Sequence, residues 1–252
     1  ATLNVKGYGN SDIFHPKNKW NHINTLLTKE KIAILAVQET HMTPERVADV
    51  ESHLKRRVRI FMSADPDTPT ARGGVAVVLN TQKVDTREAT ATEIVPGRAI
   101  LVKVKTYKED WLQILAIYAP NAPAENEQFW DKLDEWFEGN TNNKPDIMLG
   151  DFNMVEDASD RMPAHADHPA ATLAFEDLKG KLEIYDSWRT TYPDKSPTFT
   201  FHQPNYQVKS RLDRIYMKKE LIITAREWQT KASGLETDHA LVTVKVTTPA
   251  AP

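Results

Sequence analysis

The 252-residue sequence predicts an α/β fold in which two packed mixed β-sheets are flanked by helices, giving a four-layer sandwich. Strand-like apolar runs occur in both halves of the chain, and segments with apolar residues at helical spacing separate them. Hydrophobic residues make up 40% of the chain, which is enough for the core of one large domain and makes two domains the weaker alternative.

The N-terminal half predicts helices at residues 19–31 and 43–55. The first carries Trp20 and Ile23 at helical spacing, and the second begins with Thr43 as N-cap and a proline in its first turn. Strands are expected at 2–5, 32–39, 59–64, 73–80, 99–105 and 112–119, with the last two joined as a hairpin.

The C-terminal half continues the alternation of helices and strands. An amphipathic helix over 124–139 ends at Gly139, and a second helix is expected over 168–182. Strands are expected at 146–153, 197–202, 211–217, 225–231 and 239–246.

Composition limits the possible chemistry. The absence of cysteine excludes disulfides, thiolate catalysis and cysteine-based zinc sites. A net charge of −3 provides no global attraction to nucleic acid, so a polyanion would have to be bound by a local patch or through a metal ion. No apolar run approaches the ~18–20 residues that cross a bilayer, and the start "ATLNV" has no signal-peptide pattern, so we expect a domain taken from a longer protein.

Polar clusters follow or precede four of the predicted strands. Glu39 ends one strand, and is either an ordinary surface acid or a ligand of the kind Mg²⁺ prefers. Asp151 and Asn153 end another strand, and alternation places them on one face. They could form a simple turn with Gly150, or they could transfer a proton and hold a phosphoryl oxygen.

The other two clusters lie near the C-terminus. Asp213 sits in a strand between Arg211 and Arg214, where it could form a cross-strand salt bridge or orient a histidine ring. Asp238 and His239 precede the final strand; a lone histidine is more often structural, but here an acid lies directly beside it.

Further residues are candidates for substrate contact. Tyr118 and Asn121 end a strand and could donate to phosphate, or they could be ordinary residues of a turn. The segment 186–209 resembles a long hairpin whose side chains either contact DNA or pack on the sheet. Its aromatic and basic residues are Phe199, Phe201 and Tyr206, with Lys195, His202 and Lys209. The basic run at 55–59 is interpreted as a solvated face.

Six short motifs occur in an order that resembles the endonuclease/exonuclease/phosphatase superfamily. They are "LNVKG", "AVQET", "IYAPN", "LGDFN", "SRLDRIY" and "TDHALV", and together they span most of the chain. This group includes deoxyribonuclease I, apurinic/apyrimidinic (AP) endonucleases and the endonuclease domains of LINE-type retrotransposons. The chain most resembles the retrotransposon domains, fungal ones in particular, on the segments 19–42 and 150–161 and on the order of its C-terminal motifs.

The resemblance implies a deoxyribonuclease I-like fold and a role for each matching residue. Glu39 would be the main ligand of Mg²⁺ or Mn²⁺, with Asn4 and Asp238 nearby. Asp151 would transfer the proton, and Asn153 would hold phosphate or the attacking water. His239, held by Asp213, would contact the scissile phosphate or activate water. Substrate contacts would come from Tyr118, Asn121, Thr198, Phe199, Arg211 and Lys6.

Two residues depart from the pattern of relatives, and one segment is missing. Lys6 stands where AP endonucleases commonly have an acid, and Thr237 stands where many relatives have serine. No segment after "GDFN" matches the one by which AP endonucleases hold an abasic site. The acids Glu156, Asp157 and Asp160 that follow this motif are interpreted as loop scaffold.

The resulting functional hypothesis is a Mg²⁺-dependent endonuclease that nicks one strand of duplex DNA and leaves a 3′-hydroxyl to prime reverse transcription. Residues 1–246 would form the catalytic domain and 247–252 a linker toward a downstream reverse transcriptase, acting in the nucleus and not at a membrane. The alternatives are an AP endonuclease or phosphomonoesterase, or a catalytically inactive binding module, against which the intact set of candidate residues argues.

Overall fold

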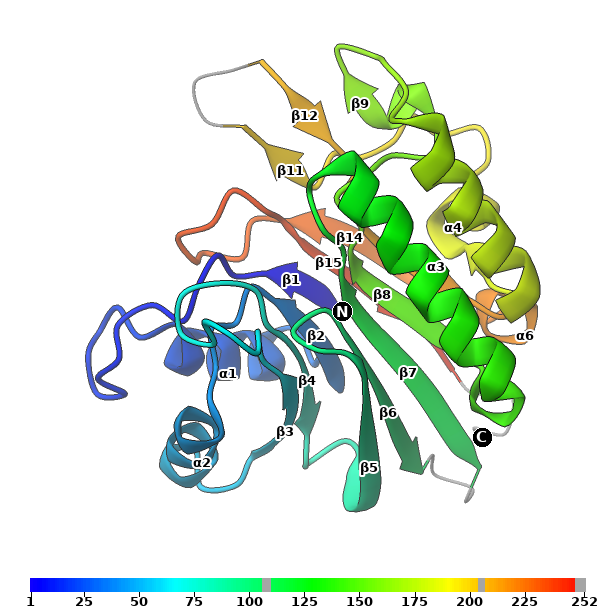
Figure 1. Ribbon diagram of the computed structural model, residues 1–252. Helices are drawn as coiled ribbons and strands as arrows, with labels where there is room; N and C mark the ends of the chain where they lie inside the picture. Colours follow the sequence, from blue (N-terminus) through cyan, green and yellow to red (C-terminus); the bar gives the residue numbers. More distant parts are fainter. Residues whose placement is uncertain (106–109, 204–206, 248–252) are drawn as a thin grey trace.

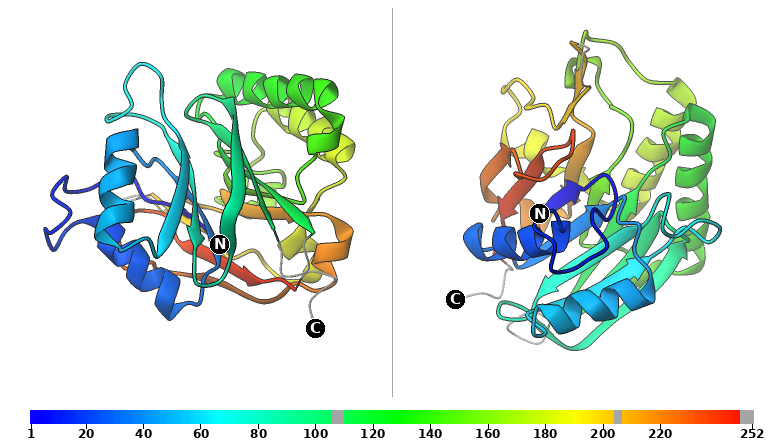
Figure 2. Two further views of the ribbon diagram at one scale, coloured as in Figure 1. Left: turned by 90° about the horizontal axis from the view of Figure 1, so that it is seen from below. Right: turned by 90° about the vertical axis from the view of Figure 1, so that its left-hand side faces the viewer.

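The computed structural model describes residues 1–105, 110–203 and 207–247 and contains two six-stranded sheets packed face to face (Figure 1). The first has the order β14-β15-β1-β2-β4-β3 and the second the order β10-β13-β8-β7-β6-β5. Helices cover the outer face of each sheet (Figure 2). The predicted four-layer sandwich is confirmed.

The strands of the first sheet are β1 (Thr2–Asn4), β2 (Ile34–Gln38), β3 (Val58–Ser63), β4 (Val75–Asn80), β14 (Arg226–Lys231) and β15 (Leu241–Lys245). Those of the second are β5 (Asp85–Val95), β6 (Ala99–Lys105), β7 (Trp111–Tyr118), β8 (Ile147–Asp151), β10 (Tyr185–Asp186) and β13 (Asp213–Met217). A small third sheet consists of β9 (Arg161–Met162), β11 (Phe201–His202) and β12 (Lys209–Ser210).

The helices are α1 (Lys19–Lys29), α2 (Pro44–His53), α3 (Pro123–Gly139), α4 (Pro169–Leu182), α5 (Ser187–Thr191) and α6 (Lys219–Ile222), with short 3₁₀ turns η1 (Thr141–Asn143) and η2 (Ala158–Asp160). As predicted, Thr43 caps α2, its hydroxyl accepting a hydrogen bond from the backbone N–H of Arg46 at 3.3 Å. None of the helices among these residues combines the length and the apolarity needed to cross a bilayer.

Three apolar cores hold the four layers together. The first lies between α1, α2 and the first sheet, and includes Trp20 and Leu35. The second lies between α3, α4 and the second sheet, where Trp130 packs against Phe175. The third fills the space between the two sheets and is made mainly of aliphatic side chains. Each sheet is therefore buried on both faces along its central strands, which explains the continuous apolar runs in the sequence.

Two strand predictions differ from the structure for physical reasons. Strand β5 was not expected, because it lies at the edge of its sheet and is mostly exposed, so its sequence is polar. The strand expected at 197–202 is reduced to Phe201–His202, and the residues before it form an irregular segment. The predicted β6–β7 hairpin is confirmed by a continuous antiparallel register from Ala99↔Ile117 to Lys105↔Trp111.

Gly150 allows β8 to lie unusually close to β7. The two strands are parallel, and Gly150 pairs with Ile117. Its φ is +151°, and a Cβ atom at this position would lie 1.9 Å from the carbonyl oxygen of Ile117. Only glycine fits there, so the position of the next residue, Asp151, depends on this contact.

Candidate active site

Five candidate side chains from separate strand ends meet at one end of the sandwich. Asn4 ends β1, Glu39 follows β2 and Asp151 ends β8, while Asp213 begins β13 and His239 precedes β15. Asp213 and Asp151 are direct partners in the antiparallel β8–β13 register. We call these five residues the site cluster.

The backbone turns sharply where these strands end. Lys6, Glu39 and Asn153 all have positive φ values, of 52°, 52° and 50°. Residues other than glycine and asparagine adopt this left-handed backbone conformation at an energetic cost, and residues in this conformation concentrate at functional sites. The turn at Glu39 is held by a hydrogen bond from the N–H of Gly7 to the Glu39 carbonyl at 2.8 Å.

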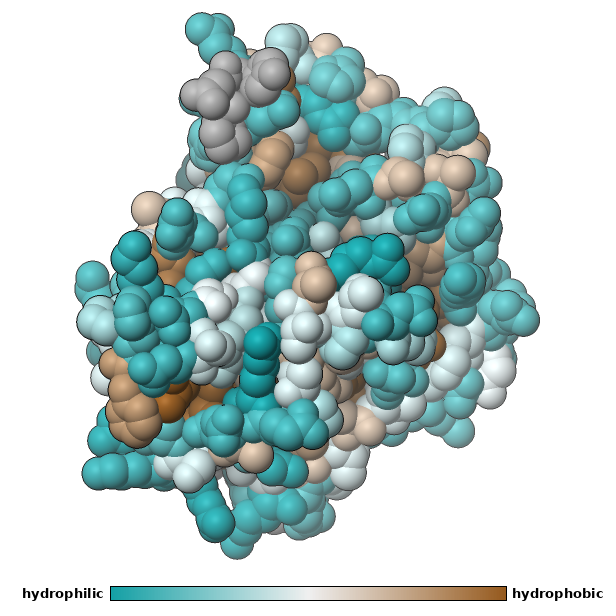
Figure 3. Space-filling model, turned by 60° about the vertical axis from the view of Figure 1, so that its left-hand side comes forward, coloured by the Kyte–Doolittle hydropathy of each residue, from teal (hydrophilic) through white to brown (hydrophobic). Residues whose placement is uncertain are grey.

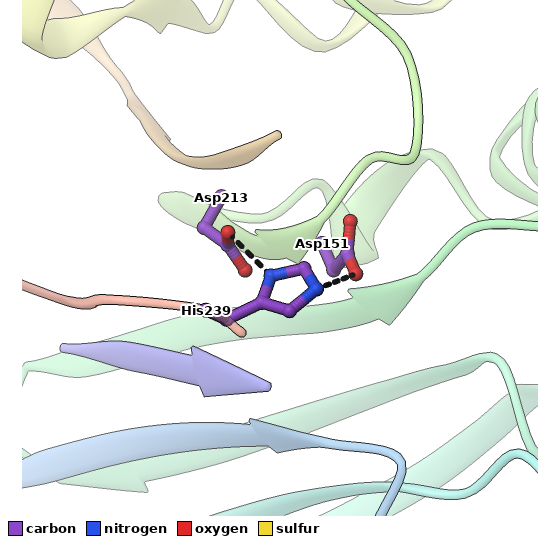
Figure 4. A group of neighbouring side chains, drawn as sticks. All are labelled: Asp151, Asp213 and His239. Carbon is purple, nitrogen blue, oxygen red and sulfur yellow. Dashed lines mark hydrogen bonds and ion pairs between the residues drawn. The ribbon is translucent and has the colours of Figure 1, made fainter. Parts of the chain in front are cut away.

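The His239 ring lies between two carboxylates (Figure 4). Its Nδ1 is 2.8 Å from Oδ2 of Asp213, and its Nε2 is 3.8 Å from Oδ2 of Asp151. The start of β13 is anchored by Thr200, whose Oγ1 accepts hydrogen bonds from the backbone N–H groups of Leu212 and Asp213. The ring is therefore fixed from both sides, in a line that runs Asp213–His239–Asp151.

The net effect of burial and neighbouring charges is to raise the pKa values of both His239 and Asp151 above their usual ranges. Burial lowers the pKa of His239, but the carboxylates of Asp213 and Asp151 outweigh it and raise the value to about 10. Burial raises the pKa of Asp151 to about 6, against the opposing effect of His239. At neutral pH the imidazole is thus a cation and a hydrogen-bond donor, while the carboxylate of Asp151 can take up a proton close to neutrality.

Asn4 connects the two carboxylates that come from different sheets. Its Nδ2 donates to Oε1 of Glu39 and to Oδ2 of Asp151, both at 2.9 Å. Its Oδ1 accepts the backbone N–H of Lys6 at 3.0 Å. Asn4 is therefore a hydrogen-bond bridge between Glu39 and Asp151, and its amide oxygen keeps a second lone pair.

Glu39 is the half-buried carboxylate best suited to a divalent cation. Burial and the charge of Glu39 raise the pKa of Tyr118 above its usual value. Asp238 is placed nearby but is paired through Oδ2 with the Lys6 ammonium at 2.8 Å. Carboxylate oxygens are the ligands that Mg²⁺ and Mn²⁺ prefer, and the residues present fit such an ion.

A second possible ligand group lies within the site cluster itself. Atoms of Asp151, Asp213 and His239 lie within 4.8 Å of one another, which is close enough to surround a metal. Both ring nitrogens of His239 already face carboxylates, however, and an ion there would compete with the imidazolium. The geometry therefore favours Glu39 as the metal-binding carboxylate.

Asn153 and Tyr118 border the cluster. Asn153 donates through Nδ2 to the carbonyl of Ala119 at 2.7 Å, and its backbone N–H donates to Oδ1 of Asp151 at 3.0 Å. The guanidinium carbon of Arg98 lies 4.5 Å from the centre of the Tyr118 ring. Arg98 was missed in the sequence, because it follows a Pro-Gly turn and belongs to none of the six motifs.

A cleft of about 840 Å³ opens beside His239. Its lining includes Lys6, Lys19 and His202 together with the loop that carries Glu236 and Asp238. Hydrophilic residues predominate on this side of the molecule (Figure 3). The ammonium groups of Lys6 and Lys19 could hold the phosphates of a nucleic acid strand next to the site cluster.

The small third sheet stands beside this cleft. Phe201 forms a bridge with His239, and the two ring centres are 5.1 Å apart. The row His202–Lys209–Met162 crosses the three strands, and all three side chains are exposed. Tyr206 falls outside the described residues.

The expected substrate contacts differ in how far they are exposed. Asn121 and Thr198 are exposed and Phe199 is half-buried; it is Thr200, two residues after Thr198, that contacts the cluster. Arg211 requires a correction. Its guanidinium is buried and paired with Asp160 and Asp186, which leaves it turned away from a substrate.

Arg211 belongs to a second group of buried charges, which we call the scaffold cluster: Glu156, Asp160, Asp186, Arg211 and Arg214. Arg211 Nε lies 3.0 Å from Asp160, and Arg214 donates to the carbonyl of Met154 at 2.9 Å. Glu156 accepts from Tyr216 and Lys179. The interpretation of Glu156 and Asp160 as loop scaffold is confirmed.

Comparison with known proteins gives one family match and one curated relative. The model of the Endonuclease/Exonuclease/phosphatase family matches residues 1–239. A protein of Xenopus laevis, the transposon TX1 uncharacterized 149 kDa protein, is 26% identical over 98% of the chain. The chain spans about a fifth of that relative, 18% of its length.

Solved structures share the fold. The 3′ phosphatase NExo from Neisseria, bound to a product DNA hairpin, superposes with a TM-score of 0.75 at 18% identity, with 98% of both chains covered. AP endonuclease LMAP from Leishmania major gives a TM-score of 0.73 at 17% identity, covering 95% of this chain and 84% of that one. The endonuclease domain of TRAS1, a telomere-specific non-LTR retrotransposon, gives 0.66 at 14% identity, covering 98% and 97%. The TRAS1 domain and the TX1 protein together confirm the predicted resemblance to retrotransposon endonuclease domains.

Proposed function

Because the chain belongs to the Endonuclease/Exonuclease/phosphatase family, we propose that it is a metal-dependent endonuclease that nicks one strand of duplex DNA. The family indicates a hydrolase, and the choice of DNA and of nicking is our proposal. The observation that carries it is the line Asp213–His239–Asp151, which Asn4 joins to Glu39. Five strand ends from two sheets converge to build this arrangement.

The reaction is hydrolysis of a phosphodiester by in-line attack of water on phosphorus, with cleavage of the bond to the 3′ oxygen. Asp151 takes the proton of the attacking water or passes one to the leaving oxygen, as its pKa of about 6 allows. His239, as a cation, donates a hydrogen bond to a phosphoryl oxygen, and Asp213 fixes the ring orientation. Asn153 and Tyr118 would hold the phosphate or the water.

Glu39 would hold the divalent cation, and Asp238 would assist once it is released from its ion pair with Lys6. When bound, Mg²⁺ or Mn²⁺ would supply positive charge to offset the charge that develops on the phosphoryl oxygens. Lys6 would then contact a neighbouring phosphate, as its exposed ammonium allows.

The biological setting follows from the relatives. The TX1 protein is far longer than this chain, which supports a catalytic domain within a larger protein. A reverse transcriptase downstream of this domain is part of the proposal. The nick would leave a 3′-hydroxyl that primes reverse transcription, and the site of action would be nuclear DNA. Lys195, His202 and Lys209, all exposed, would contact the DNA backbone beside the cut.

The structural neighbours favour one alternative, an AP endonuclease or a 3′ phosphatase. The test is incubation with supercoiled plasmid and Mg²⁺, with EDTA as the control. We expect conversion to open circles that EDTA prevents, with nick ends that a polymerase can extend. Hydrolysis of an abasic oligonucleotide or of a phosphomonoester without any nicking of intact plasmid would reject the proposal in favour of the alternative.

A further inference from the structure

A small cavity lies between the two sheets next to Asp213. Its volume is about 10 Å³, and its walls come from β13 on one side and from β14 and β15 on the other. The residues that line it include Asp213, Thr198, Thr200, Trp228 and Thr230. None of the functional roles assigned above uses Trp228, which reaches this space from a strand that carries no candidate catalytic residue.

Three of the lining residues, Asp213, Trp228 and Arg214, each have a buried polar atom without a partner among the described residues, and the first two carry this inference. Within the described parts of the chain, neither Oδ1 of Asp213 nor Nε1 of Trp228 has a hydrogen-bond partner. The first can only accept a hydrogen bond, and the second can only donate one. A buried carboxylate oxygen that receives no donor is costly, and native structures rarely leave one in this condition.

The cavity has the size and the chemistry for one water molecule. A buried water needs a probe-sized space of at least about 10–15 Å³ and two to four polar partners. Besides the two unpartnered atoms, Thr200 contributes a hydroxyl whose oxygen already accepts from two backbone N–H groups, so its proton is free to be donated. One water can therefore accept from Trp228 and Thr200 and donate to Asp213.

We propose that a single structural water occupies this cavity and bridges Trp228 to Asp213, so that Trp228 acts as a positioning residue for the site. With His239 on Oδ2 and the water on Oδ1, both oxygens of Asp213 are held and its plane is fixed. That orientation determines where the His239 ring points, and hence the donor that faces the phosphate. The kinetic part of this inference rests on the proposed nuclease function.

The first test is a crystal structure of the full chain at a resolution that shows other buried waters. We expect one density peak within hydrogen-bond distance of both Asp213 Oδ1 and Trp228 Nε1. A cavity without such a peak, or an indole N–H that bonds to a protein group instead, would overturn the inference. This test does not depend on activity, so its failure is distinguishable from failure of the proposed function.

The second test is Trp228→Phe, which keeps an aromatic ring and removes only the donor. We expect the water to shift or disappear and kcat for plasmid nicking to fall about twofold to tenfold with KM unchanged, the usual effect of one lost hydrogen bond. Trp111→Phe, at the exposed end of β7, is the matched control and should retain the parental kcat. A Trp228→Phe variant that keeps both the water and the parental kcat would contradict the positioning role.

Discussion

The site cluster and the scaffold cluster are both buried groups of charges beside β13, but they differ in how their charges are balanced. The site cluster contains three carboxylates, those of Glu39, Asp151 and Asp213, and one imidazolium. In the scaffold cluster, the carboxylates are matched by two buried arginines and by the neighbouring Arg189 and Lys179. An excess of negative charge is expensive in a protein interior, and it is retained where a cation or a proton is to be bound.

The difference shows that burial and charge alone do not identify a catalytic acid. Asp151 and Asp160 lie nine residues apart in the same segment, and both are almost completely buried. Asp160 forms ion pairs with two arginines, so its carboxylate is not available to exchange a proton or bind a cation. Asp151 is bonded to an amide and faces a histidine, so its charge remains available.

The largest expected effect comes from removing the charge of Asp151. Asp151→Asn should reduce plasmid nicking by about 10²–10⁴-fold, because it removes the group that exchanges the proton. The Tm should stay the same or rise, since the buried carboxylate disfavours folding at neutral pH. Nicking rates and thermal denaturation measure the two effects.

His239→Ala is the companion variant and should abolish nicking while the fold persists. A variant at either position that cuts as fast as the parent would remove the distinction between the two clusters.

Breaking the scaffold cluster should lower the stability of the fold and leave the nicking rate nearly unchanged. Asp160→Asn removes the carboxylate charge that Arg189 and Arg211 share and leaves Arg211 with Asp186 alone. Breaking a buried ion pair typically destabilises a protein by about 3–5 kcal/mol. Chemical denaturation should show this loss, whereas nicking at a temperature where the variant is still folded should remain near the parental rate. Asp157→Asn, at the exposed neighbouring acid, is the control and should cost about 1 kcal/mol or less.

In the parent protein, lowering the pH should abolish the activity of the site cluster before it weakens the scaffold cluster. Nicking should fall about tenfold per pH unit below pH 6, because Asp151 then becomes protonated. The fold should persist to a lower pH than the activity does. Burial alone would raise the pKa of Asp186, but Arg211 holds it below its usual value of 3.8, so its stabilising contribution is present above that value and is lost only at lower pH.

Protonation of Asp151 itself favours the folded state, since its pKa is raised on folding. We therefore expect a folded but inactive protein between about pH 4 and 6, measured by circular dichroism beside single-turnover nicking. Loss of structure in parallel with activity would show that the scaffold cluster titrates with the site.

The sequence was sufficient to predict the layers and the strand ends that carry the site cluster. Continuous apolar runs indicated sheets buried on both faces, and the polar residues that interrupt them could be located without a structure. Glu39, Asp151, Asp213 and His239 were selected on this basis, and the structure brings the last three within 4.8 Å. The distinction between Asp151 and Asp160 was made from the motif that contains Asp151. Its physical cause could not be predicted, because the arginines that pair with Asp160 are distant in sequence.

Other residues lay beyond sequence reasoning because their roles depend on register. In "PTFTF", Thr198 and Thr200 alternate onto the same side of an extended chain, and only the end point of β13 determines which one anchors Asp213. Arg211 and Arg214 both flank Asp213, yet neither faces the cleft, since each meets an acid from a distant segment. Strand β5 was missed because an exposed edge strand has no apolar run to detect.

Gly150 has a consequence for how mutations in this protein should be interpreted. It has no reactive group, and yet any side chain at this position would collide with the backbone of β7 and displace the adjacent carboxylate. In a saturation mutagenesis screen for activity, Gly150 should tolerate as few replacements as Asp151 does. A ranking of essential residues by such a screen would therefore mix groups that perform the chemistry with a position whose contribution is the absence of an atom.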